Sequence, residues 1–136
     1  MREILFRGKR KDNGEWVYGN LITDGEDVYV LPKEDLLKGL DIGGWIDGVQ
    51  TYEVVPETVG QYTNLDDKNG TKIFEKDILS AHLDDGYPEN ETLLEVVWHN
   101  NGWYGKNGKF FDDFDNGFEK YFEVIGNIHD NPELLK

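Results

Sequence analysis

Residues 56–83 read PETVGQYTNLDDKNGTKIFEKDILSAHL. Short runs of β-branched and aromatic residues alternate here with turn residues, which is typical of antiparallel strands joined by tight turns. We predict a turn of helix near Pro56, strands over residues 60–63, 72–74 and 77–82, and a turn over 67–70. Asn69-Gly70 lies in that turn, and both residue types tolerate the positive φ that tight hairpin turns require.

The same turn chemistry recurs along the whole chain. Asn-Gly pairs begin at residues 13, 69, 101, 107 and 116, and Asp-Gly pairs begin at 24, 47 and 85. The segments between them predict a hairpin of residues 3–10 and 15–22, a strand over 27–31, another over 49–55, a hairpin turning at 100–102 and a closing strand over 122–128. The predicted fold class is therefore mainly β, with α+β as the alternative classification.

The strongest helix signal covers residues 32–40, where Pro32 stands near the start and acidic residues occupy the first turn. Residues 132–135 are interpreted as a final helical turn. With 136 residues and no Gly/Ser-rich linker, we expect one compact domain, 1–136. A charge shift and Pro56 suggest two subdomains, an N-terminal β unit over 1–59 and a second unit over 60–136.

Several classes of protein are disfavoured by composition. The chain has no cysteine, as is ordinary in a reducing cytosol, and no apolar run approaches the roughly 20 residues of a membrane span. Its first residues are charged, so we expect no secretory leader and a cytoplasmic location. The formal charge is −14, which disfavours nucleic-acid and anionic-membrane partners.

One basic cluster stands against this acidic background. Arg7, Lys9, Arg10 and Lys11 lie close together near the N-terminus, while residues 41–136 hold 20 acidic and only 7 basic side chains. We interpret the cluster as a solvated strand edge or as an intramolecular partner for acidic groups. It is also the candidate surface for a nucleic acid.

Signals for catalysis or metal binding are weak. The histidines lack metal-ligand spacing, and no nucleophile, phosphate-loop or dinucleotide motif is present. Residues 111–117, FDDFDNG, place Phe114 where a calcium loop needs an oxygen ligand, so this segment is interpreted as a solvated turn. We expect a protein that is not an enzyme, with no catalytic residue, metal or cofactor.

Aromatic residues are the more informative feature. Large aromatic side chains supply core volume and also anchor protein interfaces. In residues 93–99, LLEVVWH, alternation puts Trp98 on one face with Leu94 and Val96, so Trp98 is predicted to be core. Trp103 and Tyr104 follow a turn and point to opposite faces, so one of them should be exposed. Together with Trp45 in the Gly-rich loop, they are the candidate interaction residues.

Three segments resemble the YopX family of bacteriophage and prophage proteins. They are FRGKRKDNGEWVYGNL (6–21), PETVGQYTNLDDKNGTKIFEKDI (56–78) and FEVIGNIHDNPELL (122–135). The resemblance implies a phage or prophage origin in a bacterial host cell, a mainly β fold with an SH3-like barrel element, which we place in the C-terminal part, and self-association. It implies no activity and supplies no catalytic or binding residues.

The sequence departs from the family pattern at two turns. Asn64 and Lys76 stand where glycine is usual. Asparagine is the next-best residue for left-handed backbone, so the turn at Asn64 should be retained. Lysine with positive φ is strained, so the turn at Lys76 is expected to differ in detail.

Three functions remain open from the sequence. The favoured one is a non-enzymatic interaction or self-assembling module that binds itself or a host or phage protein. The second is a nucleic-acid-related role, either direct contact by the basic cluster or mimicry of DNA by the acidic remainder. The third is an unrecognised enzyme or small-ligand binder.

Overall fold

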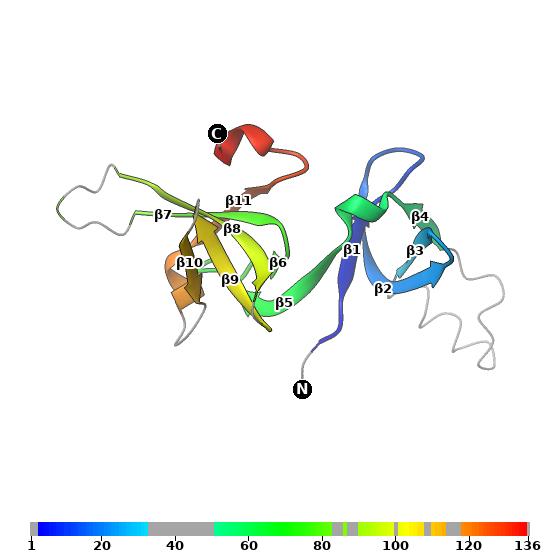
Figure 1. Ribbon diagram of the computed structural model, residues 1–136, viewed down its shortest axis with the longest axis horizontal. Helices are drawn as coiled ribbons and strands as arrows, with labels where there is room; N and C mark the ends of the chain where they lie inside the picture. Colours follow the sequence, from blue (N-terminus) through cyan, green and yellow to red (C-terminus); the bar gives the residue numbers. More distant parts are fainter. Residues whose placement is uncertain are drawn as a thin grey trace. The chain divides into compact units, whose positions relative to one another are not determined.

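The computed structural model of the chain describes residues 3–32, 51–82, 86, 90–99, 101–107, 110–113 and 118–135. The helix predicted over residues 32–40 lies outside this set apart from Pro32, which ends a strand. Trp45 also lies outside the described residues. The part that is described is mainly antiparallel β with short 3-10 helices, so the predicted fold class is confirmed (Figure 1).

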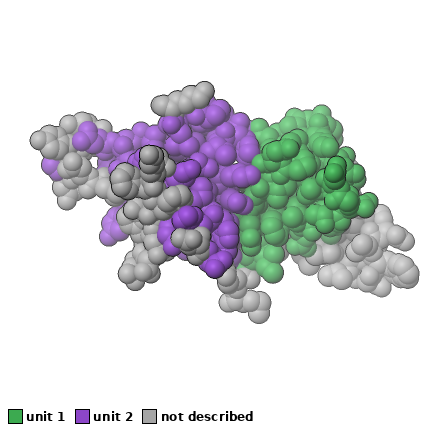
Figure 2. Space-filling model, in the orientation of Figure 1, with its two compact units in different colours: residues 1–61 green, residues 62–136 purple. Residues whose placement is uncertain are grey.

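Contacts divide the chain into two compact units, Met1–Gln61 and Tyr62–Lys136 (Figure 2). The boundary drawn from the sequence, between residues 59 and 60, lies two residues earlier. Strand β5 (Gly60–Asp66) begins in the first unit, where Gln61 pairs with Phe6, and continues in the second, where Tyr62 pairs with Phe74.

In the described part of the first unit, four strands lie in the order β4-β3-β2-β1. Their bounds are Phe6–Lys9 for β1, Trp16–Asp24 for β2, Asp27–Pro32 for β3 and Tyr52–Val54 for β4, and the 3-10 helix η1 follows at Pro56–Thr58. The two tight turns are those that the sequence predicts. Gly14 and Gly25 have φ of 73° and 64°, which an L side chain rarely adopts.

This sheet turns back on itself, because β4 also meets the end of β1. Arg10 bridges Val54, the Lys11 amide donates to Glu53 O at 3.0 Å, and the Val55 amide donates to Lys9 O at 2.8 Å. Gly8 permits the close approach, since a Cβ there would lie 2.9 Å from Val54 Cβ. Among its described residues, the buried apolar side chains of the first unit are Leu5, Val30, Leu31 and Val54.

The second unit contains a five-stranded sheet in the order β10-β9-β8-β7-β11. Its elements are β6 (Lys72–Phe74), β7 (Asp77–Ala81), β8 (Thr92–His99), β9 (Gly102–Asn107), β10 (Phe110–Asp113), η2 (Phe118–Tyr121), β11 (Glu123–Asn127) and η3 (Pro132–Leu135). The turn predicted at residues 111–117 is wrong for 111–113, which lie in β10. These residues form a strand because they pair with β9, and their own composition does not indicate this pairing.

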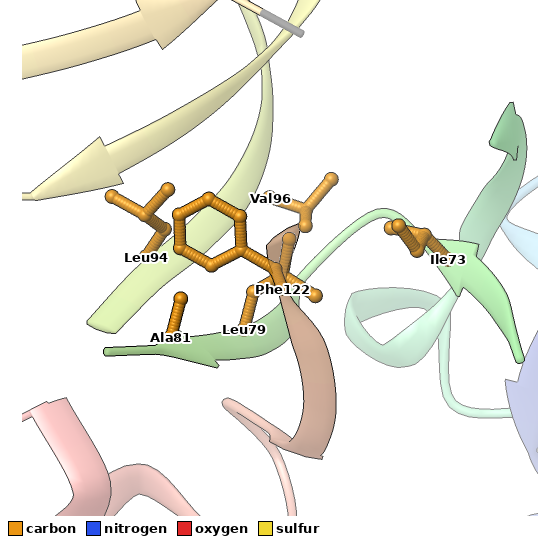
Figure 3. Packing of buried hydrophobic residues seen from close by; sticks show 6 residues of the cluster. All are labelled: Ile73, Leu79, Ala81, Leu94, Val96 and Phe122. Atoms are coloured by element: carbon orange, nitrogen blue, oxygen red, sulfur yellow. The ribbon is translucent and has the colours of Figure 1, made fainter. Parts of the chain in front are cut away.

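The core of the second unit gathers residues from far apart in the sequence. Among the described residues, six buried side chains form it: Ile73, Leu79, Ala81, Leu94, Val96 and Phe122. Figure 3 shows the Phe122 ring among the side chains of β7 and β8. The SH3-like barrel expected in this part of the chain stays a prediction.

A buried carboxylate closes the turn between β5 and β6. Asp67, 2% exposed, accepts hydrogen bonds through Oδ1 from the amides of Asn69 and Thr71, at 2.8 and 2.9 Å. Its Oδ2 accepts a bond from the amide of Val124 in β11 at 2.9 Å. The Lys68 amide adds a bond to Phe122 O at 3.0 Å. The turn is therefore fastened to a strand 57 residues further along the chain.

Both positions at which the sequence departs from the family pattern hold a left-handed residue, but Asn64 lies inside β5, where the register with β6 shifts, and not in the expected turn. Asn64 has a φ of 67°, as expected, and Lys76 has a φ of 74°. Lys76 is held there by its backbone, because its amide donates to Val96 O at 2.8 Å and its carbonyl accepts from the Ile128 amide at 3.0 Å. Lys76 therefore has the strained left-handed backbone that was expected of a lysine at this turn.

Replacing Asp67 with asparagine tests the carboxylate. The amide group would leave an NH2 facing the Val124 amide, so Asp67→Asn should lower the free energy of unfolding by about 2–3 kcal/mol. Urea unfolding followed by tryptophan fluorescence measures this. Asp24→Asn, at an exposed position, is the matched control and should change stability by less than about 0.5 kcal/mol.

Glycine at residue 76 should stabilise the protein. Removal of the left-handed penalty outweighs the entropy that glycine adds to the unfolded chain, so Lys76→Gly should raise the free energy of unfolding by about 1 kcal/mol. Lys106→Gly, at an exposed position in β9, should instead lower it by about 0.5–1 kcal/mol. A loss at residue 76 in the same urea assay would contradict the assignment of strain.

Candidate protein-interaction site

The β8–β9 hairpin ends in a group of aromatic rings. Trp98 pairs directly with Trp103 and Val97 pairs with Tyr104, while His99 pairs with Gly102. Asn101 has a φ of 63°, so the reversal uses the asparagine of this Asn-Gly pair as its left-handed residue. Because side chains alternate along a strand, Trp98 and Trp103 share one sheet face and His99 and Tyr104 share the other.

The prediction that Trp98 is core is wrong. Leu94 and Val96 on the same strand face are fully buried, but Trp98 is 54% exposed. Its place near the end of β8 explains the difference, because the core cluster includes Leu94 and Val96 and does not reach Trp98. Alternation predicts the face of a side chain but not how far along the strand the core extends.

The two faces of the hairpin end carry ring pairs of similar geometry. The Trp98 and Trp103 ring centroids lie 4.9 Å apart with planes at 72°, and those of His99 and Tyr104 lie 5.5 Å apart at 84°. Both are edge-to-face arrangements, which aromatic pairs prefer. We call Trp98, His99, Trp103 and Tyr104 the aromatic hairpin end. Such cross-strand pairs also stabilise the hairpin itself.

The predicted interaction residues fall partly in this group. Trp103 and Tyr104 are both half-buried, so the prediction that one of the two is exposed is wrong. Trp103 packs against the core of the second unit and thereby fixes its indole ring. Trp98 is the exposed residue that the sequence did not single out, and its closeness to the turn at Asn101 was the available signal.

The basic cluster of the first unit is brought against aromatic rings. Arg7 is buried, and its guanidinium lies 4.6 Å from the centroid of the Trp16 ring, over which the Lys9 ammonium also lies, at 5.5 Å. The Arg10 guanidinium lies 4.2 Å from the centroid of Tyr52. Arg7, Lys9 and Arg10 thus each lie over an aromatic ring, where the ring face attracts the positive charge.

Arg10 and Lys11 of the cluster also pair with carboxylates. Arg10 donates two hydrogen bonds to Asp12, at 2.6 and 2.9 Å, and Lys11 donates to Glu53 at 2.9 Å. The hydrogen bond from Arg10 lowers the pKa of the Asp12 carboxyl. Hydrogen bonding to Glu53 raises the pKa of the Lys11 ammonium.

These ion pairs border a small polar recess of about 210 Å³. It is lined by Arg10, Lys11, Asp12, Thr51, Tyr52 and Glu53. Ligand pockets usually occupy about 300–1,000 Å³, and the charged groups here already hold one another. The structure thus gives the predicted basic patch an intramolecular role, as the sequence interpretation allowed.

Two further features bear on the sequence predictions. Among the described residues, no three His, Asp or Glu side chains come together as metal ligands would. Within the same residues, no helix is long and apolar enough to cross a membrane.

A model of the YopX protein family matches residues 5–136. The chain belongs to the YopX family. This confirms the resemblance seen in the sequence, and it extends the match from three segments to nearly the whole chain. No curated protein matches the sequence.

Solved structures show that the YopX fold is shared. Protein EF1440 from Enterococcus faecalis is 20% identical, with a TM-score of 0.60 and all of both chains covered. YopX from Bacillus subtilis is 19% identical, with a TM-score of 0.54, and the match covers 100% of this chain and 98% of that one. At this identity the likeness concerns the fold alone, and neither structure comes with a described activity.

Truncation of the two tryptophans should have unequal effects on stability. Trp103→Ala removes a ring packed on the core and should lower the free energy of unfolding by about 2–3 kcal/mol. Trp98→Ala removes a ring that is half in solvent and should cost less than about 1 kcal/mol. Urea unfolding of both variants checks this. Equal losses would mean that Trp98 is as structural as Trp103.

The ion pair at Arg10 should be visible in a titration. Arg10→Gln should return the pKa of Asp12 towards its ordinary value, whereas Lys11→Gln should leave it depressed; carboxyl NMR shifts against pH measure both. A folded pKa below the unfolded one means that the pair stabilises the fold at neutral pH and that this is lost as pH falls through the folded pKa. No change in Arg10→Gln would remove Arg10 as the cause.

Proposed function

We propose that this YopX-family protein is a non-enzymatic protein-interaction module of phage or prophage origin. Its proposed contact surface is the aromatic hairpin end. One observation carries the proposal: Trp98 is 54% exposed while it lies against Trp103, which packs on the core.

Tryptophan is a costly side chain to leave in water. It is large and mostly apolar, and it is among the residues that most often dominate the binding energy of protein interfaces. Trp103 holds the neighbouring ring in place, so little side-chain freedom would be lost when a partner covers the pair. A fixed aromatic edge of this kind suits an interface anchor.

The other two functions have less support. The sequence contains none of the common catalytic motifs, and the polar recess beside Tyr52 is small and internally paired. Arg7 is buried, and DNA would have to compete with the carboxylates to which Arg10 and Lys11 already bond. Neutralising those cations should therefore affect stability more than any binding to DNA.

Capture and light-scattering experiments test the proposal. Immobilised protein should retain a specific partner from a bacterial lysate, or the free protein should form a defined oligomer in light scattering. Trp98→Ala should weaken either association at least tenfold. Tyr121→Ala is the matched control, because Tyr121 is 66% exposed and lies in η2, away from the hairpin in sequence.

Two results would contradict the proposal. One is a strict monomer that captures nothing. The other is an association that Trp98→Ala and Tyr121→Ala leave equally strong, which would place the interface elsewhere.

A further inference from the structure

We infer that the aromatic hairpin end binds a basic protein segment by placing an arginine or lysine side chain against Trp98. This inference rests on the proposed function and names the chemistry of the partner. It follows from two independent observations, which are the ring geometry at Trp98 and the charge of the unit that carries it.

The rings of Trp98 and Trp103 stand edge to face, an arrangement that we call the aromatic corner. Their centroids lie 4.9 Å apart and their planes meet at 72°. The face of an indole ring attracts cations more strongly than any other aromatic side chain, and guanidinium groups are the commonest partners. Because Trp98 is 54% exposed, a planar cation can reach its ring without displacing the core.

The surrounding charge favours the same partner. Within Tyr62–Lys136 the sequence holds 16 acidic and 7 basic side chains, a net charge of −9. The hairpin itself adjoins acidic sequence, because the β10 backbone sets Asp112 opposite Gly105 and Asp113 opposite Tyr104. Such a field speeds the approach of a basic segment and opposes an acidic one.

The same charge argues against two other occupants. A second copy of this chain carries the same −14 charge, so two hairpin ends would approach against mutual repulsion. A nucleic acid presents phosphates to the same field. The basic segment is the occupant for which the aromatic corner and the charge act together.

Peptide titrations of the full chain test this. The probes are ten-residue peptides of alternating glycine with arginine, lysine or glutamate, and the signals are the indole N–H resonances in NMR spectra. The arginine peptide should shift the Trp98 and Trp103 resonances and bind more tightly than the lysine peptide. The glutamate peptide should produce no shift.

Variants separate stacking from simple charge attraction. Trp98→Leu keeps an apolar side chain without the ring face and should weaken binding of the arginine peptide at least fivefold, whereas Trp98→Phe should weaken it less. Tyr121→Ala should change binding by less than twofold. The difference between wild type and Trp98→Leu should persist at high salt, where the attraction between separated charges is screened.

The outcomes distinguish this inference from the proposed function. Arginine-peptide binding that is equal in wild type and Trp98→Leu overturns the inference, because it reflects net charge alone. A captured acidic protein, a nucleic acid or a homodimer also overturns it. If such a protein or homodimer association depends on Trp98, the proposed function stands; if no association depends on Trp98, both fail.

Discussion

The second unit depends on one buried carboxylate. Asp67 accepts hydrogen bonds from the amides of Asn69, Thr71 and Val124, so it shapes the β5–β6 turn and fastens that turn to β11. Backbone amides that are buried without an acceptor are costly, and a carboxylate can serve several of them at once. With β11 so held, Phe122, the residue just before this strand, is fixed in the core beside β7 and β8.

That core in turn determines which aromatic residues the hairpin buries and which it leaves outside. In β8, Leu94 pairs with Leu79 of β7 and Val96 pairs with Gly105 of β9. The strand continues past them to Trp98, which pairs with Trp103. Trp103 packs back onto the core, while Trp98 remains about half exposed. The interaction surface is thus an extension of the folded core, which is why its rings have a defined geometry.

The turns could be predicted from the sequence because their chemistry is local. Gly14, Gly25 and Gly70 have the positive φ that Asn-Gly and Asp-Gly pairs favour. Strand β10 could not be predicted, because its residues become a strand through pairing with β9. The exposure of Trp98 could not be predicted either. It depends on where the core ends, and that core is assembled from segments that are far apart in the sequence. The hydrogen bonds of Asp67 could be predicted only in part. One of them comes from the Val124 amide, and no local sequence pattern indicates that Val124 lies beside this turn.

The Asp67 linkage belongs to the stable core of the second unit, even though two of its three amide donors lie in or beside an exposed turn. Native-state amide hydrogen exchange tests this most directly, because it reports the free energy needed to open each bond. We predict that the amides of Asn69, Thr71 and Val124 exchange together, with the same protection against exchange as core amides of β7. Exchange of Asn69 and Thr71 at the rate of an open loop, while β7 stays protected, would contradict it.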